Sequence, residues 1–151
     1  MRASRISIPD AIVDAIVTES LATYPNEACG VLLGQFLRDQ ARHVTQILPV
    51  ENSCEAEEQY HRFRITPADY LHAEKEAATQ GLEIVGFYHS HPDHPALPSD
   101  YDRDHAFPGL SYIVVAVQGR DLVQPRVIRV ASWELTPDRT SFEYEAELKQ
   151  N

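Results

Sequence analysis

The sequence predicts an α/β fold in which a mixed, mostly antiparallel sheet is flanked by helices. Segments with apolar residues at helical spacing alternate with runs rich in β-branched and aromatic residues. Their order is helix, strand, strand, helix, strand, short helix, and then three more strands. The chain has 151 residues and 43% hydrophobic content, enough for one core and too little for two domains of ordinary size. We therefore expect residues 1–151 to form a single domain.

The first part of the chain predicts one helix, a pair of strands and a loop. After Pro9, apolar residues recur at helical spacing to about Tyr24, where the pattern ends. Residues 27–35 form a nearly continuous apolar run that contains two glycines, which is typical of a buried strand. Residues 42–50 alternate in polarity and predict its hairpin partner. The polar residues 51–61 predict a loop on the surface.

The next helix has a clear start in the sequence. Thr66 suits the N-cap position, Pro67 the first helical position and Asp69 the third, and the helix should end near Gly81. A strand rich in β-branched and aromatic residues follows and is stopped by Pro92. Three further strands are predicted at residues 111–118, 127–135 and 141–148, separated by turn sequences.

The charge of the chain excludes several classes of partner. It has 13 basic and 23 acidic residues, a net charge of −10, and no basic run longer than a dipeptide. Binding to a phosphate backbone depends on clustered lysine and arginine, so we expect no nucleic-acid partner. The N-terminal segment lacks the continuous apolar region of a signal peptide, and no apolar run reaches membrane-spanning length. The sequence thus predicts a cytoplasmic protein that does not bind membranes.

The two cysteines, Cys29 and Cys54, are too few for a disulfide framework and lack the paired spacing of a structural zinc site. Cys29 lies in an apolar strand and predicts a buried thiol. Cys54 lies in a polar stretch and is compatible with an exposed thiol. Neither has a base beside it in the sequence, which disfavours cysteine nucleophile chemistry.

The stretch from Gly86 to His105 carries the most chemistry in the chain. His89 and His91 come at the end of a predicted strand, where residues two apart project from the same face. Ser90 between them should point to the other face. The two histidines therefore predict a metal-chelating pair.

Further along, Ser99-x-x-Asp102 allows two interpretations. Ser99 suits the N-cap of a short helix and Asp102 its third position, so the pair can be a capping box and nothing more. Beside the histidines, however, Asp102 supplies what a catalytic zinc site needs: three protein ligands, with a fourth position open to water. His105 lies one helical turn beyond Asp102 and is its rival as the third ligand.

These motifs resemble the signature of the JAMM (MPN+) family of zinc isopeptidases. The resemblance consists of His89-Ser-His91, seven intervening residues and Ser99-x-x-Asp102, together with an upstream Glu27 in a Glu-x-x-Gly-x-Leu-x-Gly setting. It covers nearly the whole chain in the order of strands and helices. The chain is most similar to the small stand-alone bacterial and archaeal members, which act on ubiquitin-like sulfur-carrier or modifier proteins.

The resemblance implies an MPN-like sandwich and a role for each motif residue. His89, His91 and Asp102 would bind Zn²⁺, Glu27 would be the general base, and Ser99 would stabilise the oxyanion. The reaction implied is hydrolysis after the C-terminal Gly-Gly of a ubiquitin-like partner.

Other interpretations of the same residues stay open. Glu27 alone would suit a solvated strand end. A catalytically silent MPN-type binding scaffold would have no chemical need for the complete set of motif residues. A purely structural zinc would need a fourth protein ligand, for which His94 and His105 are the nearby candidates.

Overall fold

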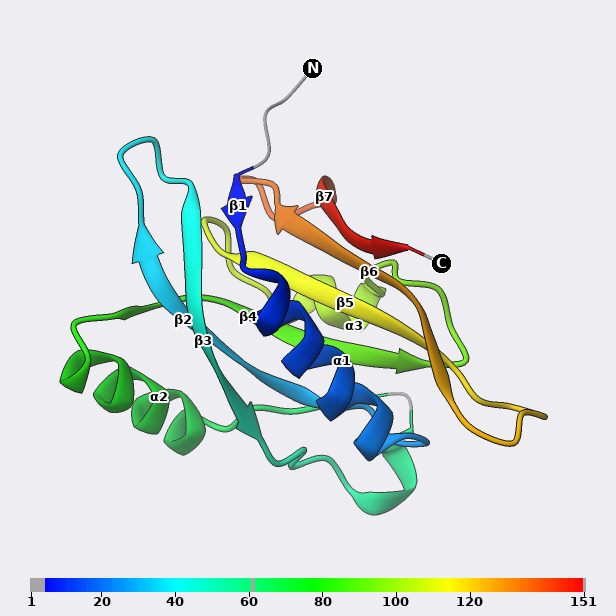
Figure 1. The fold of residues 1–151 in the computed structure, drawn as a ribbon. Coiled ribbons are helices and arrows are strands. Elements are labelled where there is room, and N and C mark those ends of the chain that lie inside the picture. Colours follow the sequence, from blue (N-terminus) through cyan, green and yellow to red (C-terminus); the bar gives the residue numbers. More distant parts are fainter. Residues whose placement is uncertain (1–4, 61, 151) are drawn as a thin grey trace.

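The computed structural model describes residues 5–60 and 62–150 (Figure 1). The strands are β1 (Ile6–Ser7), β2 (Cys29–Phe36), β3 (Arg42–Val50), β4 (Glu83–Pro92), β5 (Ser111–Gln118), β6 (Arg126–Leu135) and β7 (Phe142–Gln150). The helices are α1 (Asp10–Thr23), α2 (Pro67–Thr79) and α3 (Asp100–Asp104), with a 3-10 helix at Ala56–Glu58.

The seven strands form one sheet in the order β1-β3-β2-β4-β5-β6-β7. Strands β4 and β5 run parallel, as do β1 and β3, and the other neighbouring pairs are antiparallel. The crossover between β4 and β5 passes through α3, because parallel neighbours cannot be joined by a tight hairpin. The prediction of a mixed, mostly antiparallel sheet is confirmed.

Helices cover both faces of this sheet. Helix α1 crosses one face (Figure 1), where its fully buried Ile16 joins a core cluster with Leu32 of β2 and Tyr88 of β4. Helix α2 packs through Ala73 and Ala77 into a second core cluster, which also contains the strand residues Val31, Leu33 and Phe87. Successive strand residues thus pack into cores on opposite faces of the sheet, which explains why these strands are apolar without alternation.

Helix α2 begins as predicted. Thr66 is the N-cap; its Oγ1 accepts a hydrogen bond from the backbone N–H of Asp69 at 3.1 Å. The Asp69 carboxylate in turn accepts one from the backbone N–H of Thr66 at 3.1 Å, and Pro67 occupies the first turn. This capping box satisfies two backbone donors that the helix itself leaves unpaired.

Two features differ from the expectations. The short strand β1 was not predicted, since two residues are too few to show a periodic pattern. The polar stretch around Cys54 was compatible with an exposed thiol, but Cys54 is buried, with 5% of its surface exposed. Its loop folds back on itself, because the Cys54 N–H donates to Asn52 Oδ1 and the Cys54 carbonyl accepts from Gln59 Nε2.

The rest of that loop, residues 51–60, is mostly exposed as predicted, while residue 61 lies outside the described residues. Within the described residues, no helix has both the length and the apolar character needed to cross a bilayer.

Candidate metal centre

The pairing of β2 with β4 brings Glu27 beside the two histidines. Cys29 lies opposite His89 in the antiparallel ladder. Just before it, the backbone N–H of Ala28 donates to Ser90 Oγ at 2.8 Å, and the Ser90 N–H donates to the Ala28 carbonyl at 3.0 Å. Ser90 therefore fastens the beginning of β2 to β4, and Glu27, the preceding residue, is held near the histidines.

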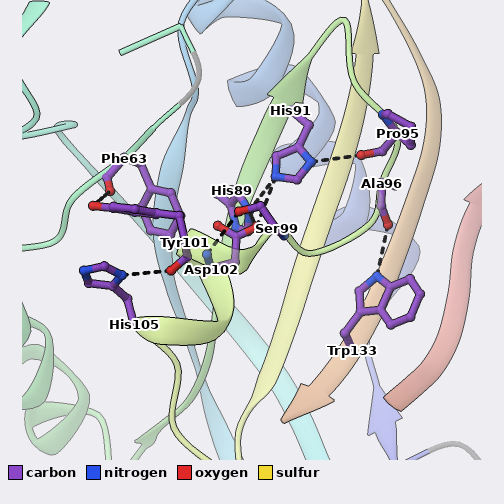
Figure 2. Close-up of polar contacts among 10 residues, drawn as sticks. All are labelled: Phe63, His89, His91, Pro95, Ala96, Ser99, Tyr101, Asp102, His105 and Trp133. Carbon is purple, nitrogen blue, oxygen red and sulfur yellow. Dashed lines mark hydrogen bonds and ion pairs between the residues drawn. The ribbon is translucent and has the colours of Figure 1, made fainter. Parts of the chain in front are cut away.

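Three side-chain atoms that can bind a metal lie close together, one each from His89, His91 and Asp102 (Figure 2). The two histidine Nε2 atoms lie 3.1 Å apart. Asp102 Oδ2 lies 3.0 Å from the first and 3.2 Å from the second. All three residues are buried. The histidines thus point to one side of β4, as the strand period predicts, and α3 carries the carboxylate to them.

Asp102 also caps the helix on which it lies. Its backbone N–H donates to Ser99 Oγ at 3.1 Å, and its Oδ2 accepts from the Ser99 N–H at 2.9 Å. The two interpretations of Ser-x-x-Asp are therefore compatible, because the same oxygen completes the capping box and faces the histidines. Burial tends to raise the pKa of Asp102, but the charge and hydrogen bonds of the two histidines outweigh it and hold the pKa well below its ordinary value.

The hydrogen bond of His91 fixes the form of its ring. His91 Nδ1 lies 2.9 Å from the carbonyl oxygen of Pro95, which can only accept, so Nδ1 carries the proton. The Nε2 of a neutral His91 then has its lone pair free for a metal. The ring of His89 is stacked on Phe63 with centroids 4.5 Å apart, and burial lowers the pKa of His89, which favours its neutral form.

Glu27 is buried beside this centre, with 4% of its surface exposed. Ligand atoms of Glu27, His89 and His91 all lie within 4.8 Å of one another. Among the described residues, its Oε1 has no hydrogen-bond partner. Burial and the charge of Asp102 raise the pKa of Glu27 to about 8, against the opposing charge of His91. A buried carboxylate oxygen without a partner is costly unless a cation or water lies against it.

The donor set fits a zinc ion. Ligand atoms about 2.0–2.2 Å from a tetrahedral zinc lie roughly 3.3–3.6 Å apart, close to the 3.0–3.2 Å found between the three atoms. Two imidazole nitrogens and one carboxylate oxygen are typical zinc ligands. Three protein ligands would leave a fourth position for water. Glu27 is the nearby acid outside the close triangle, with a ligand atom within 4.8 Å of those of both histidines.

The centre opens into a cleft of about 290 Å³. The cleft is lined by Glu27, His91, His94, Pro95, Leu97 and Ser99. Among these residues, His94, Pro95, Leu97 and Ser99 are exposed. His105 faces elsewhere: its Nδ1 lies 2.8 Å from the carbonyl oxygen of Tyr101, and its ring is stacked on the Tyr101 ring (Figure 2). This contact favours Asp102 over His105 as the third ligand.

Sequence reasoning missed a group of aromatic residues next to the centre. A second cavity, of about 160 Å³, borders His89 and Asp102. Its aromatic lining consists of Phe63, Tyr70, Phe87, Tyr101, Phe107 and Tyr112. The Tyr101 hydroxyl donates to the Phe63 carbonyl at 3.1 Å and so joins α3 to the segment before α2. These residues come from distant parts of the chain and show no local motif.

Comparisons with known proteins agree with this architecture. The sequence model of the prokaryotic homologs of the JAB domain matches residues 9–135. The chain is 34% identical over 125 residues to a desampylase of Haloferax volcanii, covering 80% of this chain and 86% of the relative. It is 27% identical over 112 residues to a probable TtuB-protein conjugate cleaving protease of Thermus thermophilus, covering 74% and 70%.

A solved structure extends the likeness to the whole fold. A protein of Salinibacter ruber with 36% identity superposes with a TM-score of 0.71, covering 93% of this chain and 88% of that one. The family match spans most of the chain and includes every motif residue of the centre. The chain therefore belongs to the small prokaryotic JAMM/MPN family.

Proposed function

We propose that this protein is a zinc-dependent peptidase or isopeptidase. In this proposal it hydrolyses the bond that follows the C-terminal Gly-Gly of a ubiquitin-like sulfur-carrier or modifier protein. The observation that carries the proposal is the triangle of His89 Nε2, His91 Nε2 and Asp102 Oδ2, with the Glu27 carboxylate near it and an open cleft lined by Glu27 and His91. The names of the two relatives, a desampylase and a conjugate-cleaving protease, support the substrate class.

The triangle would hold the metal. Hydrogen bonds orient two of its three ligands, His91 and Asp102, whereas the buried His89 Nδ1 has no hydrogen-bond partner among the described residues. A zinc ion held there would lower the pKa of its water from 15.7 to roughly 7 and polarise a carbonyl group. The Pro95 carbonyl fixes the His91 tautomer, and the Ser99 N–H orients Asp102 Oδ2. Such contacts keep the ligand atoms in place and reduce the reorganisation that binding requires.

Glu27 is the general base of this proposal. Its buried carboxylate lies within 4.8 Å of both histidine ligand atoms, and its Oε1 is not engaged by another described group. It can accept a proton from the attacking water and pass it to the departing amine. The positive charge of a bound metal would oppose the effect of burial on its pKa and favour the ionised form.

Ser99 is the proposed oxyanion donor. Its Oγ accepts a hydrogen bond from the Asp102 N–H, and this contact leaves the hydroxyl proton free to be donated. Ser99 also lines the cleft with Glu27 and His91, where a substrate carbonyl would lie. Removing a comparable donor from other enzymes costs about 3 kcal/mol of transition-state stabilisation.

The substrate is constrained by the shape of the approach. A cleft at the end of a sheet can receive an extended peptide, and a Gly-Gly tail has no side chains to clash with its walls. We infer a small ubiquitin-like partner in the cytoplasm, with no nucleic-acid or membrane partner. The chain is acidic overall, with a net charge of −10, which agrees with the exclusion of nucleic acid.

The test uses a folded ubiquitin-like carrier extended by one residue after Gly-Gly, and an unstructured peptide with the same tail. Purified protein with zinc should shorten the folded carrier to Gly-Gly, measured by mass spectrometry of its C-terminus, and should cleave the free peptide more slowly. Glu27→Gln is the control: it should keep zinc and fold but lose about 100-fold or more in kcat. Cleavage of neither substrate by the zinc-loaded protein would contradict the proposal and favour a binding scaffold.

A further inference from the structure

The position of Glu27 depends on its backbone more than on its side chain. Its carboxylate is buried, and Oε1 makes no hydrogen bond to any described group. Strand β2 begins only at Cys29, so Glu27 precedes the strand. The hydrogen bonds that hold this segment are those of the backbone of residues 27 and 28.

Ser90 of β4 binds the backbone of Ala28, and the loop between β3 and α2 binds the backbone of Glu27. The Glu27 N–H donates to the carbonyl of Gln59 at 2.6 Å. The Glu27 carbonyl accepts a hydrogen bond from the side chain of Asn52, with Nδ2 at 3.3 Å. Both polar groups of the Glu27 backbone are thus bound by one loop, and a side chain makes one of these two bonds.

Asn52 is the centre of this loop. Its Nδ2 also donates to the carbonyl of Arg62 at 2.7 Å. Its Oδ1 accepts from the N–H groups of Cys54 at 3.0 Å and Arg64 at 3.2 Å. Both donor hydrogens and both acceptor positions of the amide are used. The reversed amide would face two carbonyls with its oxygen and two N–H groups with its nitrogen, so only this orientation satisfies all four.

Gln59 strengthens the same arrangement. Its Nε2 donates to the backbone carbonyls of Asn52 at 3.2 Å and Cys54 at 2.8 Å. The loop is therefore closed on itself at the point where the Gln59 carbonyl meets Glu27. A loop bound in this way can act as a rigid support for the residue beside it.

We propose that Asn52 is a positioning residue that holds the Glu27 carboxylate at the metal centre by binding the Glu27 backbone to the loop, of which the structure describes residues 51–60 and 62–64. The catalytic part of this inference rests on the proposed function, in which Glu27 is the general base. A displacement of about 1 Å of such a group can lower a rate by about 100-fold without changing the chemistry available.

The test compares Asn52→Asp with wild type. Aspartate has the same shape and keeps the two acceptor contacts, but it loses both donor contacts, including the one to Glu27. We expect hydrogen exchange of the Glu27 amide, measured by NMR, to become at least tenfold faster. We expect kcat to fall by tenfold or more, KM to change less than twofold, and zinc content to stay the same because Asn52 contacts no metal ligand in the described structure.

The matched control is Thr66→Ala, which removes the cap of α2 nearby without contacting Glu27. It should lower the melting temperature while leaving the Glu27 amide exchange and kcat close to wild type. If Asn52→Asp behaves like this control in both measurements, the proposal is overturned. If Asn52→Asp lowers the melting temperature more than the control, both variants are compared at equal distance below their own melting temperatures.

The exchange measurement also separates this inference from the proposed function. If the wild-type protein cleaves no substrate, the proposed function fails, yet the exchange of the Glu27 amide still shows whether Asn52 holds that segment. Unchanged exchange in Asn52→Asp overturns the proposal whatever the activity. Faster exchange with unchanged kcat in an active enzyme overturns its catalytic part.

Discussion

A single oxygen of Asp102 has two structural tasks. Oδ2 accepts the Ser99 N–H that caps α3, and it lies 3.0 and 3.2 Å from the two histidine nitrogens. A residue that only capped the helix could be replaced by another capping side chain with little effect on the histidines. A residue that also binds metal could not, because asparagine and serine are poorer ligands than a carboxylate.

This distinction gives a prediction for the third ligand. Asp102→Asn keeps a side chain that can cap but weakens metal binding, and Asp102→Ala removes both functions. Contacts outside the metal-binding shell change metal affinity by about 10–100-fold, so loss of a ligand should cost at least as much. Zinc titration against a competing chelator should show this loss in both variants and none in His105→Ala. Zinc loss in His105→Ala with retention in Asp102→Ala would make His105 the ligand.

The sequence predicted the long elements well because their signals are local. Helix α2 was predicted from a capping box within four residues, and β4 from its β-branched and aromatic run. Strand β1 has two residues and pairs with β3 far along the chain, which no local pattern can show.

Some features of the metal centre could likewise be predicted from local sequence, and others could not. The pair His89 and His91 follows from the strand period alone, and the Ser99–Asp102 capping box from its spacing. The stacking of Phe63 on His89, the Pro95 carbonyl and the Asn52 contact to Glu27 join segments that no spacing rule relates. Such contacts are fixed by packing and hydrogen bonding after the elements assemble.

At the scale of elements, Asp93 holds the loop that follows β4. Its Oδ2 accepts from the Tyr24 hydroxyl at 2.6 Å, and its Oδ1 accepts from the N–H groups of Gly119 and Arg120, each at 2.9 Å. These bonds tie the ends of α1 and β5 to the loop that carries the Pro95 carbonyl to His91. Burial raises the pKa of Asp93, but these three hydrogen bonds and the charge of Arg120 together outweigh it and hold the pKa below its ordinary value.

We expect Asp93→Ala to lower the free energy of unfolding by about 2 kcal/mol, because three hydrogen bonds are lost and alanine fits the φ of 57° poorly. Asp93→Asn should cost about half as much, since asparagine tolerates this φ and can still accept. Asp121→Ala, at an exposed residue with a φ of 64°, measures mainly the cost of placing alanine at a positive φ. Urea denaturation should show the largest loss of stability in Asp93→Ala. An equal loss in all three variants would contradict this account.

At the scale of the whole molecule, a buried ionic network joins strands that are far apart in the sheet. Arg42 of β3 has a fully buried side chain whose Nη1 lies 2.7 Å from Glu134 Oε2 of β6 and 3.0 Å from Glu145 Oε2 of β7. Because β3 and β6 are separated by three strands in the sheet order, the sheet must curl to bring them together. Arg5, which precedes β1, agrees with this curl, since its Nε lies 3.6 Å from Glu134 Oε2 of β6; Figure 1 draws β1 beside the end of β6.

Within this network, the pKa of Glu145 depends on its burial and on the groups around it. Its side chain is 3% exposed, and its Oε1 accepts from the hydroxyls of Ser111 at 2.8 Å and Ser132 at 2.7 Å. Burial raises the pKa of Glu145, while the two serines and Arg42 lower it in part and the charge of Glu134 adds to the increase. Removal of Arg42 should therefore raise this pKa further, because it leaves a buried carboxylate without its cation.

We expect Arg42→Met to lower the free energy of unfolding at pH 8 by about 3–5 kcal/mol, the usual cost of breaking a buried ion pair. When a carboxyl pKa is higher in the folded state, the folded protein binds more protons between the two pKa values, so stability falls as pH rises through that window. The deficit of Arg42→Met relative to wild type should therefore shrink from pH 8 to pH 5.5, measured by urea denaturation. Arg42→Met/Glu145→Gln should recover part of the loss at pH 8 and show less pH dependence. A deficit that is equal at both pH values would contradict this account. The same urea curves test the domain organisation: two separate unfolding transitions in the wild type would contradict the prediction of a single domain.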